Sequence, residues 1–102
     1  MPRISYVQTL IGSYEEYKQH HTNIWPSMLE LFREHKITHF TIDYLASTNQ
    51  LFCIIEYQDQ ELFDSIVNNK VNQEWWNLMM KYVQFDANNI PVTESLDFTW
   101  KY

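Results

Sequence analysis

Three side chains near the start of the chain have the types and the spacing for proton transfer. Tyr17, His21 and Trp25 follow one another at intervals of four residues, so a helix stacks all three on one side. An imidazole is the side chain that most often performs acid–base chemistry near neutral pH, and here it stands beside a phenol. The same spacing also fits a helix that packs an aromatic face on a sheet, with His21 bonded to a backbone carbonyl. Spacing alone leaves both interpretations open.

A second unusual feature is the pair of adjacent tryptophans, Trp75 and Trp76. Neighbouring residues of a helix diverge by about 100°, so one indole can enter the core while the other faces a cavity. An indole ring suits the apolar face of a pyranose, and its N–H can donate to a sugar hydroxyl. Two core tryptophans are the alternative, so the pair is consistent with a sugar site without requiring one.

The other chemistry-bearing residues form no recognisable metal or nucleophile motif. His20 adjoins His21 but lies about 100° around the helix, so the two cannot share a role. His35 and His39 fall in different expected elements, and no His-Glu-x-x-His motif occurs. Cys53 is the single cysteine and sits in an apolar run, where we expect an inert core thiol. We therefore expect no bound metal.

Four segments that must position these residues have the pattern of β-strands: residues 3–11, 37–45, 51–57 and 94–101. In the second of them, Phe40, Ile42 and Tyr44 share one face. The third begins with an unbroken apolar run, which favours a central position that is covered on both faces.

Two helical regions separate these strands. A capping box at Ser13 and Glu16 starts the first region, in which Pro26 predicts a kink or a break around residues 22–26. The second region, residues 60–69 and 71–83, forms either one broken helix or two short ones. The order β-α-β-β-α-β predicts a single ferredoxin-like domain of the α+β class over residues 1–102, an antiparallel sheet with its helices on one face. Since the other face is left bare, we expect it to pack on a second copy in a homodimer.

The composition narrows the classes of partner. The net charge is −6 and the seven basic residues are scattered over 102 positions, so neither nucleic acid nor an anionic membrane surface is an expected partner. The sequence contains no apolar stretch long enough to span a membrane and no signal peptide, which predicts a soluble cytoplasmic protein. Aromatic residues make up 17% of the chain, and sugar pockets, haem pockets and subunit interfaces all use them. A neutral small molecule fits this balance best.

The segment around His21 resembles the signature of a known enzyme family. Residues 15–26, EEYKQHHTNIWP, resemble the E-E-Y-x-x-x-H-x-x-I-W-P motif of the L-rhamnose mutarotases. Residues 74–76 followed by Met79 resemble that family's R/E-W-W-x-x-M element, and Asn89 and Pro91 its loop before the last strand. The resemblance covers nearly the whole chain in order and at the same spacings. It implies a dimeric α/β barrel of ferredoxin-like subunits, in agreement with the layout above.

The resemblance also implies roles for individual residues. His21 is implied as the proton donor, and the sugar contacts are Tyr17, Phe40, Trp75 and Trp76. The implied reaction interconverts the α and β anomers of L-rhamnose by opening the pyranose ring to the aldehyde and closing it on the other face. Ring opening and closure exchange protons between oxygens, so the reaction needs neither a metal nor a redox cofactor.

Two positions depart from the family pattern. Phe40 stands where the family usually has a tyrosine that contacts the sugar, which removes a hydrogen bond worth about 0.5–1.5 kcal/mol. The family's D-N-S-P loop reads NNIP at residues 88–91, without its acid. Neither change touches His21 or Tyr17, so anomer exchange stays the expected reaction. The identity of the sugar is open, with L-fucose or another 6-deoxy aldose as alternatives to L-rhamnose.

Two other classes of function stay open from the sequence. Small ferredoxin-like dimers also include haem- or aromatic-substrate monooxygenases, in which His21 would ligate haem and the protein would be coloured. A non-catalytic relative would bind sugar without accelerating anomer exchange, and the change at Phe40 permits it.

Overall fold

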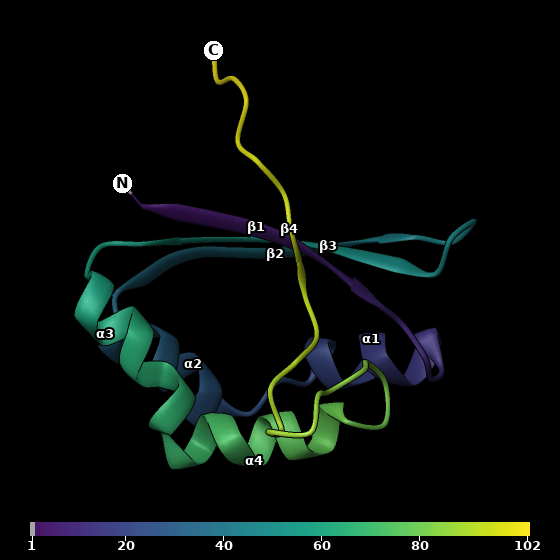
Figure 1. The fold of residues 1–102 in the computed structure, drawn as a ribbon. Helices are drawn as coiled ribbons and strands as arrows, with labels where there is room; N and C mark the ends of the chain where they lie inside the picture. The colour runs from purple at the N-terminus through teal and green to yellow at the C-terminus, as the bar shows by residue number, and fades with distance from the viewer. Residues whose placement is uncertain (1) are drawn as a thin grey trace.

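The computed structural model describes residues 2–102, and it places a layer of helices on one face of a four-stranded antiparallel sheet (Figure 1). The strands are β1 (Arg3–Thr9), β2 (Ile37–Leu45), β3 (Gln50–Tyr57) and β4 (Glu94–Ser95), in the sheet order β2-β3-β1-β4. The helices are α1 (Tyr14–Thr22), α2 (Pro26–Glu34), α3 (Gln60–Ser65), the short 3-10 helix η1 (Ile66–Asn68) and α4 (Lys70–Met79). With β3 antiparallel between β1 and β2, the sheet has the ferredoxin-like order, which confirms the predicted α+β class.

The two faces of the sheet are covered differently. On the helix side Tyr6, Cys53 and Ile42 are cross-strand neighbours, and along β3 buried residues alternate with half-buried ones. The half-buried residues of β3, which include Phe52 and Ile54, point to the face that carries no helix. The prediction that β3 is central is confirmed. All the helices lie on one side, as predicted (Figure 1), so the predicted cover over the other face of β3 depends on a second copy and stays a prediction.

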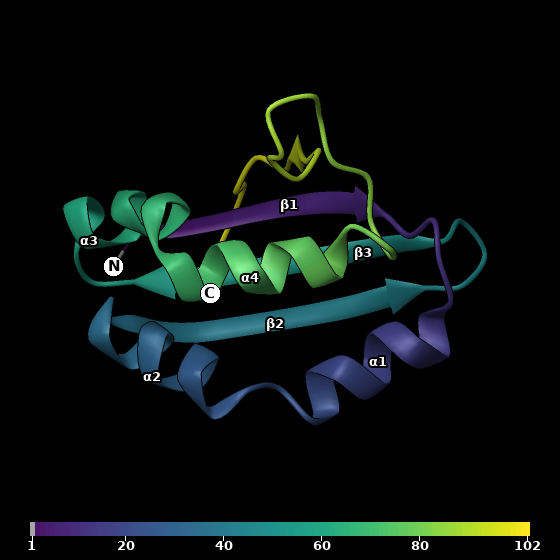
Figure 2. The ribbon, with the colours of Figure 1, turned by 90° about the horizontal axis from the view of Figure 1, so that it is seen from below.

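The break between α1 and α2 follows from Pro26. A proline has no backbone N–H to donate, and Pro26 takes the first position of α2, where helices need no such donor. The Asn23 N–H donates to the Gln19 carbonyl and ends α1, so the predicted break around residues 22–26 is confirmed. Figure 2 shows α1 and α2 lying end to end beside β2, with α4 over the middle of the sheet. His21 consequently lies in the last turn of α1.

Two contacts fix the start of α1. The Ser13 hydroxyl accepts from the Glu16 N–H at 3.3 Å, as the capping box predicts, whereas the Glu16 carboxylate accepts from the Tyr82 hydroxyl at 3.2 Å. Just before the helix, Gly12 lies so close to the chain leaving α4 that a methyl group there would overlap the Lys81 carbonyl oxygen. Glycine therefore permits the close approach that holds α1 against the end of α4.

The second helical region is divided by its own caps. The Asp59 carboxylate accepts from the Leu62 N–H at 2.9 Å and starts α3, and the Asn69 side chain accepts from the Val71 N–H at 2.9 Å and starts α4. The sequence left open one broken helix or two short helices. The structure has two short helices, α3 and α4, joined by η1. No helix within residues 2–102 is long and apolar enough to cross a membrane.

The C-terminal segment departs most from the sequence prediction. The strand predicted over residues 94–101 is wrong in length, since β4 contains only Glu94 and Ser95, paired with β1. Residues 96–102 then leave the sheet toward the side opposite the helices (Figure 1). They keep a strand-like alternation of apolar residues, and the Leu96 N–H still donates to the Ser5 carbonyl of β1 at 2.9 Å, but no assigned strand of the described chain extends past Ser95, and Trp100 is 73% exposed. The pattern is that of a strand, but the pairing with β1 ends after the Leu96 bond and the rest of the segment leaves the sheet.

Candidate active site

A cavity of about 900 Å³ lies on the helix side of the sheet, and its wall contains all five residues that the sequence assigned to the site. These are Tyr17 and His21 from α1, Phe40 from β2, and Trp75 and Trp76 from α4. The volume is at the upper end of the range of about 300–1,000 Å³ that is usual for small-molecule sites. The fold therefore brings the predicted site residues together from three elements that are far apart in the sequence.

The imidazole of His21 is oriented by its own helix. Its Nδ1 lies 2.8 Å from the Tyr17 carbonyl oxygen, and because a carbonyl can only accept, Nδ1 must be the donor. In the neutral ring, Nε2 therefore keeps the lone pair. The ring also packs against Tyr17, with centroids 4.3 Å apart, and against the edge of Trp75, with centroids 5.3 Å apart. One carbonyl and two aromatic rings together fix the direction of Nε2.

Burial tunes both titratable groups of this pair. It lowers the pKa of His21 below the ordinary 6.5, because desolvation disfavours the imidazolium. The Tyr17 carbonyl opposes this shift, and the charge of neighbouring His20 adds to it. Burial raises the pKa of the Tyr17 hydroxyl, so the phenol stays protonated. At neutral pH the site thus combines an imidazole that can accept a proton with a phenol that can donate a hydrogen bond.

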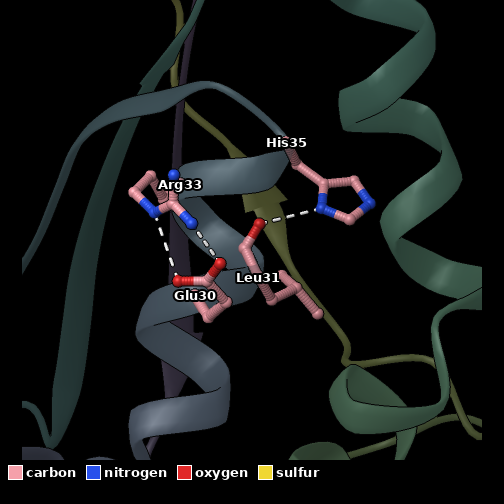
Figure 3. Close-up of polar contacts among 4 residues, drawn as sticks. All are labelled: Glu30, Leu31, Arg33 and His35. Atoms are coloured by element: carbon pink, nitrogen blue, oxygen red, sulfur yellow. Dashed lines mark hydrogen bonds and ion pairs between the residues drawn. The ribbon is translucent and has the colours of Figure 1, made fainter.

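The bond from Nδ1 to a backbone carbonyl does not by itself mark a catalytic histidine. His35, at the end of α2, lies at the same distance, 2.8 Å, from the Leu31 carbonyl oxygen (Figure 3). His35 does not line the cavity, and the same stretch of α2 carries the exposed ion pair between Arg33 and Glu30. His21 is therefore distinguished by its place in the cavity wall. The two interpretations left open by its spacing are compatible, since His21 makes the backbone bond and also borders the cavity.

The two tryptophans differ in burial. Trp75 is only 6% exposed and meets Trp25 edge to face, with centroids 5.1 Å apart. Trp76 is half-buried and packs edge-on against Phe85 at 6.2 Å. Both indoles border the cavity. The sequence predicts that one ring enters the core and the other faces a cavity. Trp76 is the ring that faces the cavity, while Trp75 is in the core and also borders the cavity.

His20 and His21 have separate surroundings, as their angular separation predicts. The His20 Nε2 lies 3.0 Å from the Tyr82 hydroxyl, and that hydroxyl donates to Glu16. Since Tyr82 has one proton to donate, His20 is the donor in the contact between them. None of these three residues lines the cavity, so the hydrogen-bond series from His20 through Tyr82 to Glu16 lies outside it.

Sequence reasoning missed several polar side chains of the cavity wall. Tyr6, Gln8, Lys18 and Asn72 all border the cavity. Tyr6 lies beside Cys53, whose buried thiol has its pKa raised to about 11, as expected of an unreactive core cysteine. Asn72 gave no signal because a polar residue in an amphipathic helix normally indicates the exposed face. Within residues 2–102, no three His, Cys, Asp or Glu side chains gather in a way that could hold a metal ion.

Known proteins share this sequence pattern and this fold. The model of the family described as L-rhamnose mutarotase matches residues 4–101. The L-rhamnose mutarotase of Listeria monocytogenes is 32% identical over 97 residues, which cover 94% of this chain and 93% of that protein. The L-rhamnose mutarotase of Bacillus subtilis is 35% identical over 83 residues, covering 81% and 80%. A crystal structure of L-rhamnose mutarotase from Formosa agariphila matches with a TM-score of 0.87 at 23% identity and covers 100% of this chain and 99% of that one, which shows a shared fold.

We expect His21 to titrate below pH 6.5 and to carry its proton on Nδ1 at neutral pH, because burial disfavours the imidazolium and the Tyr17 carbonyl accepts a hydrogen bond from Nδ1–H. Long-range ¹H–¹⁵N NMR spectra of the imidazole rings measure both properties. His20→Gln should raise the pKa of His21, because it removes the repulsion between two adjacent imidazolium ions. A His21 pKa above 6.5, or a proton on Nε2 at neutral pH, would contradict the geometry.

Proposed function

Because the chain belongs to the L-rhamnose mutarotase family, an enzyme family, we propose that it interconverts the α and β anomers of L-rhamnose or a related 6-deoxy sugar. The observation that supports this most directly is the neutral imidazole of His21, whose Nδ1 is bonded to a carbonyl and whose ring borders the cavity. Tyr17, Trp75 and Trp76 line the same cavity and give it a phenol and two indoles, the kinds of group that bind a sugar's hydroxyls and its apolar face.

In the proposed reaction His21 moves a proton between two oxygens bound to the same carbon. Its Nε2 takes the proton of the anomeric hydroxyl, the bond from the anomeric carbon to the ring oxygen breaks, and the anomeric oxygen becomes an aldehyde carbonyl. The imidazolium then gives its proton to the departing ring oxygen. After rotation of the aldehyde, the new hydroxyl attacks its other face and the two proton transfers run in reverse. No C–H bond breaks and no electrons are transferred, so a single imidazole suffices.

The surroundings of His21 would hold the sugar in place. The Tyr17 hydroxyl, kept protonated by burial, can donate to a sugar oxygen, and the half-buried Trp76 offers its ring to an apolar face. Phe40 borders the cavity with an apolar ring only. It suits the methyl group of a 6-deoxy sugar but makes no hydrogen bond, so the choice among such sugars depends on the other polar groups of the wall.

We expect the protein to accelerate exchange between the anomeric protons of L-rhamnose, measured by saturation-transfer NMR. His21→Ala should lower that rate by roughly 10²- to 10⁴-fold, because it removes the group that moves the proton. His35→Ala is the matched control, since it removes an imidazole with the same bond to a helix carbonyl outside the cavity, and it should keep the wild-type rate. The rate should also fall as the pH drops through the lowered pKa of His21, because imidazolium cannot accept a proton.

Other outcomes of this experiment separate the alternatives. Acceleration for L-fucose but not for L-rhamnose keeps the reaction and changes the substrate. Sugar binding without acceleration would identify the non-catalytic relative, and equal rates in both histidine variants would remove His21 from the mechanism. The family match argues against a haem monooxygenase.

We also propose that two copies pack together through the sheet face that carries no helices. Phe52 and Ile54 are half-buried on that face of β3, and Phe98 lies next to it, with its ring 4.8 Å from the Arg3 guanidinium. An apolar sheet face is stable when another layer covers it. The C-terminal segment, residues 96–102, leaves the sheet on the same side (Figure 1), and it contains the exposed Trp100.

Sedimentation velocity should give a particle with twice the 12.5 kDa mass of the chain. Ile54→Glu should give monomers, because it places a charge in the centre of the proposed interface. Ile11→Glu is the matched control in the β1–α1 loop, where the side chain is already 61% exposed, and it should stay dimeric. A monomeric wild type, or a dimeric Ile54→Glu variant, would contradict the proposed interface.

The cytoplasmic location stays a prediction from the sequence. It is supported by Cys53, a free and buried thiol. Such a residue requires no oxidising compartment, unlike the cysteines of disulfide-stabilised secreted domains.

A further inference from the structure

The side chain of Asn72 has an unpaired hydrogen-bond donor. Of the polar and charged residues, tyrosines apart, only Asn72 is buried within residues 2–102, with 4% of its surface exposed. Its amide nitrogen Nδ2 is buried and has no hydrogen-bond partner in the described chain. A buried donor left in this state costs about 1–3 kcal/mol, and such groups in native proteins normally have a partner. The described residues supply no partner for this nitrogen.

Asn72 occupies a place where a ligand can supply that partner. It borders the same cavity as His21 and shares the buried face of α4 with Trp75 and Met79. The spacing of these three residues follows one side of a helix, with Asn72 one turn before the indole that contacts His21. The backbone is held independently, since the Asn69 side chain accepts from the Asn72 N–H at 3.3 Å. The Asn72 residue is thus held by its backbone in the cavity wall, close to the proposed reaction centre.

We propose that the Asn72 amide donates a hydrogen bond to a hydroxyl of the bound sugar and helps to determine which sugar is accepted. This inference rests on the proposed function. A hydroxyl oxygen is an acceptor that matches a neutral amide N–H, and binding it would satisfy a donor for which the described chain has no partner. A sugar without that hydroxyl leaves the donor buried and unpaired. Sites of this kind discriminate strongly against an analogue that lacks the bonded group.

The substitution Asn72→Leu tests the proposal, because it replaces the amide by an apolar group of similar size. Loss of the bond should raise the KM for L-rhamnose about tenfold, equivalent to about 1.4 kcal/mol, with a smaller effect on kcat. The Tm should stay the same or rise, because an unpaired buried donor has been removed. Asn77→Leu, the same substitution at an exposed position of α4 outside the cavity, should leave both KM and Tm near wild type. If Asn72→Leu does not fold, Asn72→Ala removes the same amide and should raise KM likewise.

Monodeoxy analogues of L-rhamnose identify the hydroxyl concerned. For one of them, wild type and Asn72→Leu should have the same KM, since the bond is already absent. A bound water as the partner of Nδ2 predicts instead a lower Tm and an unchanged KM in Asn72→Leu, which would overturn the inference. Equal KM values for L-rhamnose in the Asn72 and Asn77 variants would also overturn the inference. The proposed function would still hold in that case if the wild-type protein accelerates anomer exchange. If the wild type accelerates exchange of no aldose, the proposed function fails and the inference fails with it.

Discussion

The packing of Trp75 is the constraint on which the candidate site depends. Its buried indole meets His21 on one side and Trp25 on the other, both edge to face. Aromatic pairs in this geometry contribute about 0.5–1.5 kcal/mol each beyond the burial of their area. They join α4 to the end of α1 and to the break before α2, which are distant in the sequence. The imidazole is thereby held between the Tyr17 ring of its own helix and an indole of another.

One environment sets the chemistry of the whole site. The burial that packs these rings lowers the pKa of His21 and raises the pKa of Tyr17, so a neutral base and a protonated phenol stand side by side. Pairs of titratable groups whose pKa values are shifted in opposite directions by their surroundings are typical of acid–base sites. Within residues 2–102, the same apolar surroundings offer the Asn72 Nδ2 no hydrogen-bond partner. In the proposed complex, the sugar supplies polar atoms to these groups, and its ring packs on the aromatic walls of the cavity.

Local interactions made much of this predictable from the sequence. The spacing of Tyr17 and His21 and the break at Pro26 depend on helix geometry within a few residues, and they appear as expected. Features that depend on contacts between distant residues could not be predicted in this way. The Glu16 carboxylate accepts from Tyr82, 66 positions away, and no local pattern indicates such a bond. The strand predicted over residues 94–101 stops at Ser95, although the Leu96 N–H still bonds to β1, and no local pattern indicates that the chain turns away from the sheet there. The burial of Asn72 could not be predicted, because asparagine is a polar residue type that is usually exposed.

The central claim is that the His21 Nε2 faces the reacting oxygens of a sugar held in this cavity. A crystal structure of the protein with bound L-rhamnose tests it most directly. The account predicts that Nε2 lies within about 3.2 Å of the anomeric oxygen or the ring oxygen, with the pyranose against Trp76. A sugar bound with its anomeric carbon away from His21, or outside the cavity, would contradict the account.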